Sequence, residues 1–158
     1  MVEILSKSEA QTKKVAKLLA EEIFSPTSRR TKNQAWVIGL EGELGSGKTR
    51  FIQGFAKKLG IRQRLTSPTF VLLKKYRIPK KKVTSYKLRV TSYLFHIDCY
   101  RLNKPKELLD LDFKEIISNP QNIVLIEWAE KVHSILPRDT IWVRFKIVSK
   151  KERRIKII

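Results

Sequence analysis

The first part of the chain carries apolar residues at helical intervals. Val15, Leu18, Leu19 and Ile23 recur on one helical face and predict a leading amphipathic helix. Ser6 and Glu9, at the spacing of a capping box, place its expected start. The Ser-Pro-Thr-Ser run at residues 25–28 predicts its end, because a residue before proline avoids the helical region.

Two later runs are short and wholly apolar, at residues 35–40 and 123–126. Such runs are typical of strands that are buried on both faces of a sheet. A glycine-rich turn follows the first run, and the spacing predicts a helix over 48–59 that Gly60 ends in a left-handed conformation. Strand, glycine turn and helix in this order are typical of the opening of an α/β nucleotide-binding fold.

The remaining pattern predicts more strands and two short helices. Residues 69–78 and 93–98 are rich in β-branched and aromatic residues, which indicates strands, and 107–109 and 113–117 favour short helices. After Pro137 the chain alternates with a period of two, which predicts a C-terminal β-hairpin. We therefore expect an α/β, P-loop NTPase-like three-layer fold: a central mixed β-sheet flanked by helices and closed by that hairpin.

Composition narrows the class of protein. With 158 residues the chain is expected to form one domain, residues 1–158, around one core. No apolar run approaches the roughly 20 residues that span a bilayer, so no membrane segment is expected. One cysteine, Cys99, cannot form an internal disulfide, which favours a reducing, cytoplasmic location.

The net charge of +19 is the unusual feature, from 34 Lys and Arg against 15 Asp and Glu. Between Lys74 and Phe95 eight basic residues occur with no acidic one. Such a balance favours a polyanionic partner, either nucleic acid or an acidic protein face, although a solvated cationic surface explains it equally well. We expect Lys80, Lys81 and Lys82, in a turn between two strands, to contact such a partner, through nucleic-acid phosphates or an acidic protein face.

The segment Gly42–Thr49 matches the pattern G-x-x-x-x-G-K-[ST] and lies between the predicted strand and helix. Its glycines allow successive amides to point at one anion, to which the following helix adds its positive end. Lys48 supplies a charge for the β- and γ-phosphates, and the Thr49 hydroxyl is a ligand suited to Mg²⁺. We therefore predict a nucleoside triphosphate and Mg²⁺ as ligands. The expected nucleotide contacts from this segment are Gly42, Leu44, Gly45, Ser46, Gly47, Lys48, Thr49 and Arg50.

A P-loop also needs an acid at the end of a neighbouring strand to hold the metal. Glu127 follows the second apolar run directly and is the predicted partner of Thr49 in the Mg²⁺ site. A buried strand that ends in a glutamate is common, so this assignment depends on the P-loop.

Four motifs in order resemble the TsaE family, the small ATPase of bacterial tRNA threonylcarbamoyladenosine synthesis. They are Gly42–Thr49, Ser67-Pro68-Thr69-Phe70, His96-x-Asp98-x-Tyr100-Arg101-Leu102 and Leu125-Ile126-Glu127-Trp128. The resemblance covers nearly the whole chain. Its turn between the second and third motifs, residues 78–91, is longer and more basic than is usual in the family.

The resemblance implies slow ATP hydrolysis with Mg²⁺, beside the TsaB–TsaD pair that modifies adenosine 37 of ANN-decoding tRNAs. It also implies that the acids at Asp98 and Glu127 are needed for activity, and that the segment around Thr69 acts as a switch loop. Adenine is expected near Thr12 and around residues 150–153. We accordingly predict Asp98, Glu127 and Lys48 as catalytic, with Thr69 and Thr12 as further ATP contacts.

Several of these residues have a purely structural alternative. Asp98 could orient the attacking water, or instead cap a turn or pair with Arg101. Trp128 is a candidate partner or nucleotide contact, although core packing is the usual role of a tryptophan. His96 fits a packed or hydrogen-bonded residue better than a metal ligand, because no second His or Cys lies at metal-binding spacing.

Other classes of protein remain open at the level of sequence. A small-molecule P-loop kinase would transfer phosphate from ATP to an acceptor. A nucleic-acid-binding module with a vestigial P-loop would bind tRNA without needing nucleotide. A GTPase is disfavoured, since Asn103-Lys104-Pro105-Lys106 has a lysine where the guanine-binding N-K-x-D motif requires aspartate.

Overall fold

The computed structural model describes residues 1–25, 33–66, 72–79 and 92–158. Thr69 and its neighbours Ser67 and Pro68 lie outside the described residues, as do Lys80, Lys81 and Lys82. The roles predicted for them therefore stay predictions.

Seven strands form one mixed sheet in the order β1-β7-β6-β2-β5-β4-β3. Its centre is parallel: β2 pairs in parallel with both β5 and β6, and β4 pairs in parallel with β5. The outer pairs are antiparallel, including the predicted hairpin of β6 and β7. The strands are β1 (Val2–Ser6), β2 (Trp36–Glu41), β3 (Leu73–Ile78), β4 (Ser92–Asp98), β5 (Asn122–Glu127), β6 (Ile141–Ile147) and β7 (Arg153–Ile157).

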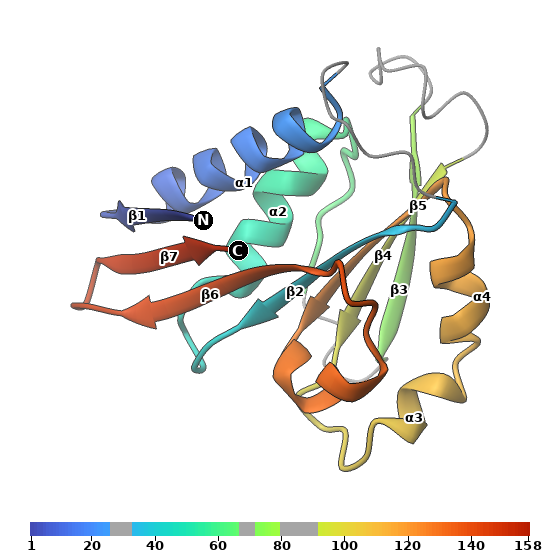
Figure 1. Cartoon of the computed structure of the whole chain (residues 1–158). Helices are drawn as coiled ribbons and strands as arrows, with labels where there is room; N and C mark the ends of the chain where they lie inside the picture. The colour runs from blue at the N-terminus through green and yellow to red at the C-terminus, as the bar shows by residue number, and fades with distance from the viewer. Residues whose placement is uncertain (26–32, 67–71, 80–91) are drawn as a thin grey trace.

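Helices cover both faces of the sheet (Figure 1). On one face α1 and α2 pack over a core that includes Ile38 and Leu125. On the other face α3, α4 and a 3₁₀ helix, η3, pack over a core that includes Val37 and Val124. Adjacent residues of β2 and β5 thus point into opposite cores, which confirms the predicted burial on both faces. The helices are α1 (Glu9–Ile23), α2 (Lys48–Lys58), α3 (Lys106–Leu109), α4 (Phe113–Ser118) and η3 (Ala129–Ile135).

The three-layer α/β prediction is confirmed, and the start of the chain differs from expectation. Residues Val2–Ser6 form strand β1, which pairs with β7, and α1 is capped by Ser8 rather than by Ser6. The Ser8 hydroxyl accepts a hydrogen bond from the Gln11 amide at 3.2 Å, and the Gln11 side chain accepts one from the Lys7 amide at 2.6 Å. Ser8 therefore caps the helix two residues later than predicted, and the Gln11 side chain bonds the amide before the cap and not the cap's own amide, as a complete capping box would.

The end of α2 follows the prediction, with Gly60 at φ 82° just beyond the last helical turn. None of the helices in the described parts of the chain has both the length and the apolar character needed to cross a membrane. The single domain and the cytoplasmic location stay predictions from the sequence.

Candidate functional site

The loop between β2 and α2 has the backbone shape that phosphate binding requires. Gly47 immediately precedes α2 with φ 104°, a left-handed conformation that strains any other residue. Gly42 has φ 146°, and a Cβ atom there would lie only 2.6 Å from the carbonyl oxygen of Phe145. The first glycine of the motif therefore lets β2 turn tightly against β6, and the last opens the N-terminus of α2 toward the cavity.

Lys48 is folded back over this loop. Its Nζ atom donates to the carbonyl oxygens of Gly42 at 2.5 Å and Glu43 at 2.9 Å, and it lies 4.0 Å from the centre of the Trp128 ring. Burial lowers the pKa of the ammonium group, while nearby carboxylates, above all Glu127, partly oppose the shift. The ammonium group thus lies beside the loop, where its closest hydrogen-bond acceptors are neutral carbonyl oxygens.

Thr49 and Glu127 are in direct contact, although 78 residues separate them. The Thr49 hydroxyl lies 2.9 Å and 3.0 Å from the two carboxylate oxygens of Glu127. Glu127 is 4% exposed at the end of β5 and also accepts from Nε2 of His96 at 2.8 Å. The structure thus places both predicted Mg²⁺ ligands together, and it assigns His96 the hydrogen-bonded role expected from the sequence.

Asp98 ends β4, the strand next to β5, and its Cα is the register partner of Glu127. Both carboxylates therefore emerge at the same edge of the parallel part of the sheet. Oδ1 of Asp98 accepts a hydrogen bond from the Tyr100 amide at 2.9 Å, so the residue does stabilise a turn. It also lines the same cavity as Lys48, so the turn contact does not remove it from the site.

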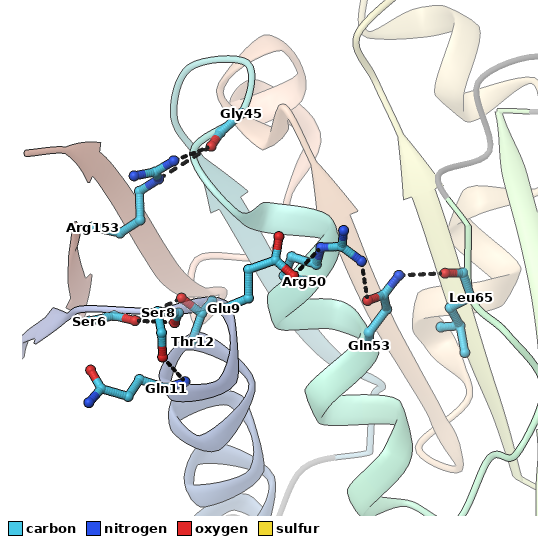
Figure 2. A network of polar contacts seen from close by, with 10 residues as sticks. All are labelled: Ser6, Ser8, Glu9, Gln11, Thr12, Gly45, Arg50, Gln53, Leu65 and Arg153. Atoms are coloured by element: carbon cyan, nitrogen blue, oxygen red, sulfur yellow. Dashed lines mark hydrogen bonds and ion pairs between the residues drawn. The ribbon is translucent and has the colours of Figure 1, made fainter. Parts of the chain in front are cut away.

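These residues surround one cavity of about 890 Å³. Its walls come from the P-loop, the start of α1, the ends of β4 and β5, and the β6–β7 hairpin. Thr12 and residues 150, 151 and 153 line it, and these are the positions near which the family resemblance implies the adenine. Figure 2 shows Arg153 reaching from the hairpin to the P-loop, where its guanidinium donates to the Gly45 carbonyl at 3.0 Å and 3.3 Å.

Other predicted residues meet this cavity to differing degrees. Trp128 is half-buried and lines it, with its ring 5.0 Å from that of Tyr100. Arg50 lines it while its guanidinium pairs with Glu9 at 3.1 Å. Gly42 lies behind the loop and does not line it. The remaining predicted residues in the cavity wall are Leu44, Gly45, Ser46 and Gly47.

Sequence reasoning missed several residues in and around this cavity, of which two bear on its chemistry. Tyr100 was quoted only as part of a motif, yet it lines the cavity. Glu130 follows β5 on η3 and acts electrostatically on Lys48; its own pKa is raised, chiefly by burial. No sequence motif marks an acid three residues after a strand-end glutamate. Glu130 is therefore recognised only in the structure, where the turn into η3 brings it near Lys48.

A glycine-rich loop of the P-loop pattern joined to a helix, with two acids at neighbouring strand ends of a mixed α/β sheet, defines a protein of the P-loop NTPase-like class. The sequence model of the family "Threonylcarbamoyl adenosine biosynthesis protein TsaE" matches residues 6–155. The chain therefore belongs to the TsaE family.

Individual relatives agree with that assignment. A Rickettsia felis protein named "tRNA threonylcarbamoyladenosine biosynthesis protein TsaE" is 32% identical over 98% of this chain and 78% of its own length. A Treponema pallidum protein of the same name is 34% identical over 81% of this chain and 85% of its own. The crystal structure of Bacillus subtilis YdiB superposes with a TM-score of 0.66 and 28% identity, covering 99% of this chain and 83% of that one.

Proposed function

We propose that this chain binds ATP with Mg²⁺ in the P-loop cavity and hydrolyses it slowly, as a component of tRNA N6-threonylcarbamoyladenosine synthesis. The names of its relatives support the pathway. The observation that carries the nucleotide part is the contact of Thr49, in the P-loop, with the buried carboxylate of Glu127. That contact brings the two halves of a metal–triphosphate site together.

Lys48 and the loop amides are the groups that would hold the phosphates. Lys48 now donates to neutral carbonyl oxygens, and a phosphate oxygen is a stronger, charge-assisted acceptor. The ammonium therefore gains by exchanging those contacts for the ligand. An anion beside it would also favour its protonated form, opposing the effect of burial on its pKa.

The donor set suits Mg²⁺. Thr49 and Glu127 offer hard oxygen ligands, which this cation prefers, and it usually takes one or two carboxylates together with phosphates and waters. In the described ranges no group of three or more His, Cys, Asp or Glu side chains forms a ready-made metal cage, which is the pattern expected of such a shared site. When bound, Mg²⁺ would neutralise charge on the phosphates.

Asp98 and Glu127 would share the work at the phosphate end. Glu127 would hold the metal side together with Thr49, and His96 would fix the orientation of its carboxylate. Asp98, on the neighbouring strand, is the carboxylate we assign to orient the attacking water. Thr12 and the hairpin around Arg153 would hold the adenine end of the same cavity.

The family resemblance supports TsaB–TsaD as the partner complex and adenosine 37 of tRNA as the modified base. Trp128, half-buried at the rim of the cavity, is a candidate contact for either the partner or the nucleotide. We expect hydrolysis to reset the modifying complex between rounds, while the partner pair transfers the threonylcarbamoyl group.

Calorimetry with Mg–ATP tests the nucleotide site directly. We expect heat of association for the wild type, none for Lys48→Ala, and an unchanged signal for Lys58→Ala, a lysine of the same helix that pairs with Glu21 on the surface. Folded wild-type protein that shows no heat would overturn the enzymatic proposal. If such protein still bound tRNA, the vestigial P-loop alternative would replace it.

ATP turnover, with and without TsaB–TsaD and tRNA, tests the pathway. Glu127→Ala should abolish turnover in both settings, whereas Glu115→Ala, which removes an exposed acid on α4, should change neither. Turnover that ignores the partners and tRNA would contradict the assignment to this pathway while leaving the ATPase in place.

A further inference from the structure

A second hollow, of about 740 Å³, lies between α1, α2 and the segment that follows α2. We call it the basic groove and define it by its basic lining. Of the thirteen described residues that line it, six are basic and none is acidic. The basic ones are Lys13, Lys17, Arg50, Lys57, Arg62 and Arg64.

The groove exists because the two helices approach very closely at one point. A Cβ atom on Gly54 would lie 2.5 Å from the carbonyl oxygen of Lys13, so only glycine allows this crossing. Lys13 and Lys17 are one turn apart on α1, and Arg50 and Lys57 are two turns apart on α2, so each pair lies on one helical face. The two faces together form two basic walls of the groove.

The third wall is held in place by a chain of polar contacts, drawn in Figure 2. Glu9 pairs with Arg50, Arg50 donates to Gln53 at 3.3 Å, and Gln53 donates to the carbonyl oxygen of Leu65 at 2.9 Å. This chain ties the segment carrying Arg62 and Arg64 to α2.

Among the described residues, most of these charges have no acidic partner. Arg50 pairs with Glu9, but none of the other five forms an ion pair with a carboxylate from the part of the chain that is described. Five like charges around one hollow repel each other, and an anion with several charges along its length would relieve that repulsion.

The lining favours nucleic acid over an acidic protein. Protein interfaces are enriched in aromatic side chains and have an apolar centre. None of the described residues that line the groove is aromatic, and the larger apolar ones, Ile61 and Leu65, are buried. Interfaces with nucleic acid are more polar and far more positive. Without an aromatic platform for stacking bases, the contacts would go to phosphates.

We propose that the basic groove binds the phosphate backbone of a folded RNA. The choice of RNA over DNA rests on the proposed function. The expectation of a polyanionic ligand rests only on the basic lining of the groove. Arg50 lines both the groove and the P-loop cavity, so the backbone would run past the N-terminal end of α2, next to the nucleotide.

The test measures binding of a fluorescent tRNA transcript by anisotropy at several salt concentrations. The groove variant carries Lys13→Gln, Lys17→Gln, Lys57→Gln and Arg62→Gln. The matched control carries Lys104→Gln, Lys106→Gln, Lys114→Gln and Arg138→Gln, which remove the same charges from exposed positions outside both cavities. A DNA duplex and poly-glutamate serve as competing probes.

We expect the groove variant to bind tRNA at least about tenfold more weakly than the control, with a salt slope smaller by about 3, since each lost phosphate contact removes about 0.7–0.9. Equal affinities and slopes for the two variants would overturn the proposal. Sensitivity confined to poly-glutamate would make the groove a protein site instead.

Calorimetry with Mg–ATP on the same two variants separates this proposal from the nucleotide function. Both should bind nucleotide as the wild type does. A groove variant that loses tRNA but keeps Mg–ATP supports the groove, whereas wild-type protein that binds tRNA through the groove but shows no heat with Mg–ATP would overturn only the proposed ATPase.

Discussion

His96 places its Nε2 atom 2.8 Å from Oε1 of Glu127, and both side chains are buried between β4 and β5. The other ring nitrogen, Nδ1, has no hydrogen-bond partner among the described residues. Among the described residues, the imidazole therefore hydrogen-bonds only to the Glu127 carboxylate, to which Nε2 donates. Because Thr49 donates to the same carboxylate, Glu127 is held in one orientation from two sides, which makes His96 a positioning residue for the proposed metal site.

Replacing His96 with phenylalanine should disturb the metal side of the site and little else. The ring is apolar at the position of the unpartnered Nδ1, but Glu127 loses one of its two donors. We expect turnover to fall by about 10- to 100-fold and the Mg²⁺ concentration for half-maximal turnover to rise, as is usual when a ligand loses its supporting hydrogen bond. Titrating Mg²⁺ at saturating ATP measures both.

His96→Gln is the matched control, since its amide can still donate to the carboxylate. It should recover part of the Mg²⁺ affinity. Two variants with equally weakened turnover and an unchanged Mg²⁺ requirement would show that the ring matters only for packing.

The sequence predicted those parts of the fold whose signal is local. The two apolar runs became β2 and β5 because each lies between two cores, and the alternation after Pro137 became the hairpin. Strand β1 has no such signal: within Val2–Ser6 only Ser6 is fully buried, and the strand depends on pairing with β7 about 150 residues away. No local periodicity of apolar residues predicts that long-range pairing.

The same division holds for the candidate site. The P-loop pattern identified Lys48 and Thr49 as candidate site residues. The position of Glu127 after an apolar run made it the predicted metal ligand. The contact of His96 with Glu127 depends on the parallel register of β4 and β5. The contact of Arg153 with Gly45 depends on how the hairpin lies across the loop. Neither the register nor that placement can be read from residue types alone.

Cys99 offers an internal probe of folding near the site. It is fully buried, and burial raises the pKa of its thiol to about 12, with Asp98 and Glu130 adding to the shift. The thiolate is the reactive species, so we expect almost no labelling by a disulfide reagent near pH 8 in the native protein and complete labelling in denaturant. It is the chain's one cysteine, so the signal is unambiguous.

The same shift makes stability depend on alkaline pH. Between the ordinary value of 9.0 and about 12, the thiol is protonated in the folded state and ionised in the unfolded state. The folded state binds more protons there, so the free energy of unfolding falls as pH rises, by about 1 kcal/mol per pH unit. Urea unfolding at two pH values should show a shallower fall in Cys99→Ala. Equal slopes would mean that the folded protein ionises this thiol readily.

Arg153 joins the hairpin to the P-loop and should influence nucleotide affinity. Its guanidinium donates to Gly45 and, at 2.9 Å each, to the carbonyls of Ser149 and Glu152. A lysine keeps the charge but not the planar fork that spans these acceptors. We expect Arg153→Lys to weaken ATP binding by about tenfold in calorimetry and to change the free energy of unfolding by less than about 1 kcal/mol.

Its neighbour supplies the control. Arg154 pairs with Glu3 at 3.4 Å on the surface, where half of each side chain is exposed, so Arg154→Lys should leave ATP affinity unchanged. If both variants bind ATP as the wild type does, the contact between hairpin and loop is structural only.

Gly54 is the point at which α1 and α2 touch, and an added methyl group there should push them apart. The new Cβ atom would lie 2.5–2.9 Å from three backbone atoms of Lys13, which no side-chain rotation can relieve. Overpacking costs about 1–3 kcal/mol, and the three close backbone contacts place this change in the upper half of that range. Replacing glycine with alanine gains about 1 kcal/mol of helix propensity in return. We expect Gly54→Ala to lower the free energy of unfolding by about 1–2 kcal/mol in urea.

Two comparisons give this result its meaning. Lys58→Ala changes an exposed position of the same helix and should cost less than about 1 kcal/mol, because surface ion pairs contribute little. The stability loss of Gly54→Ala should also be accompanied by weaker tRNA binding, since separating the helices moves Lys13 and Lys17 away from Lys57. A Gly54→Ala protein that is as stable as the wild type would show that the helices can part freely, and the basic groove would then lack a fixed shape.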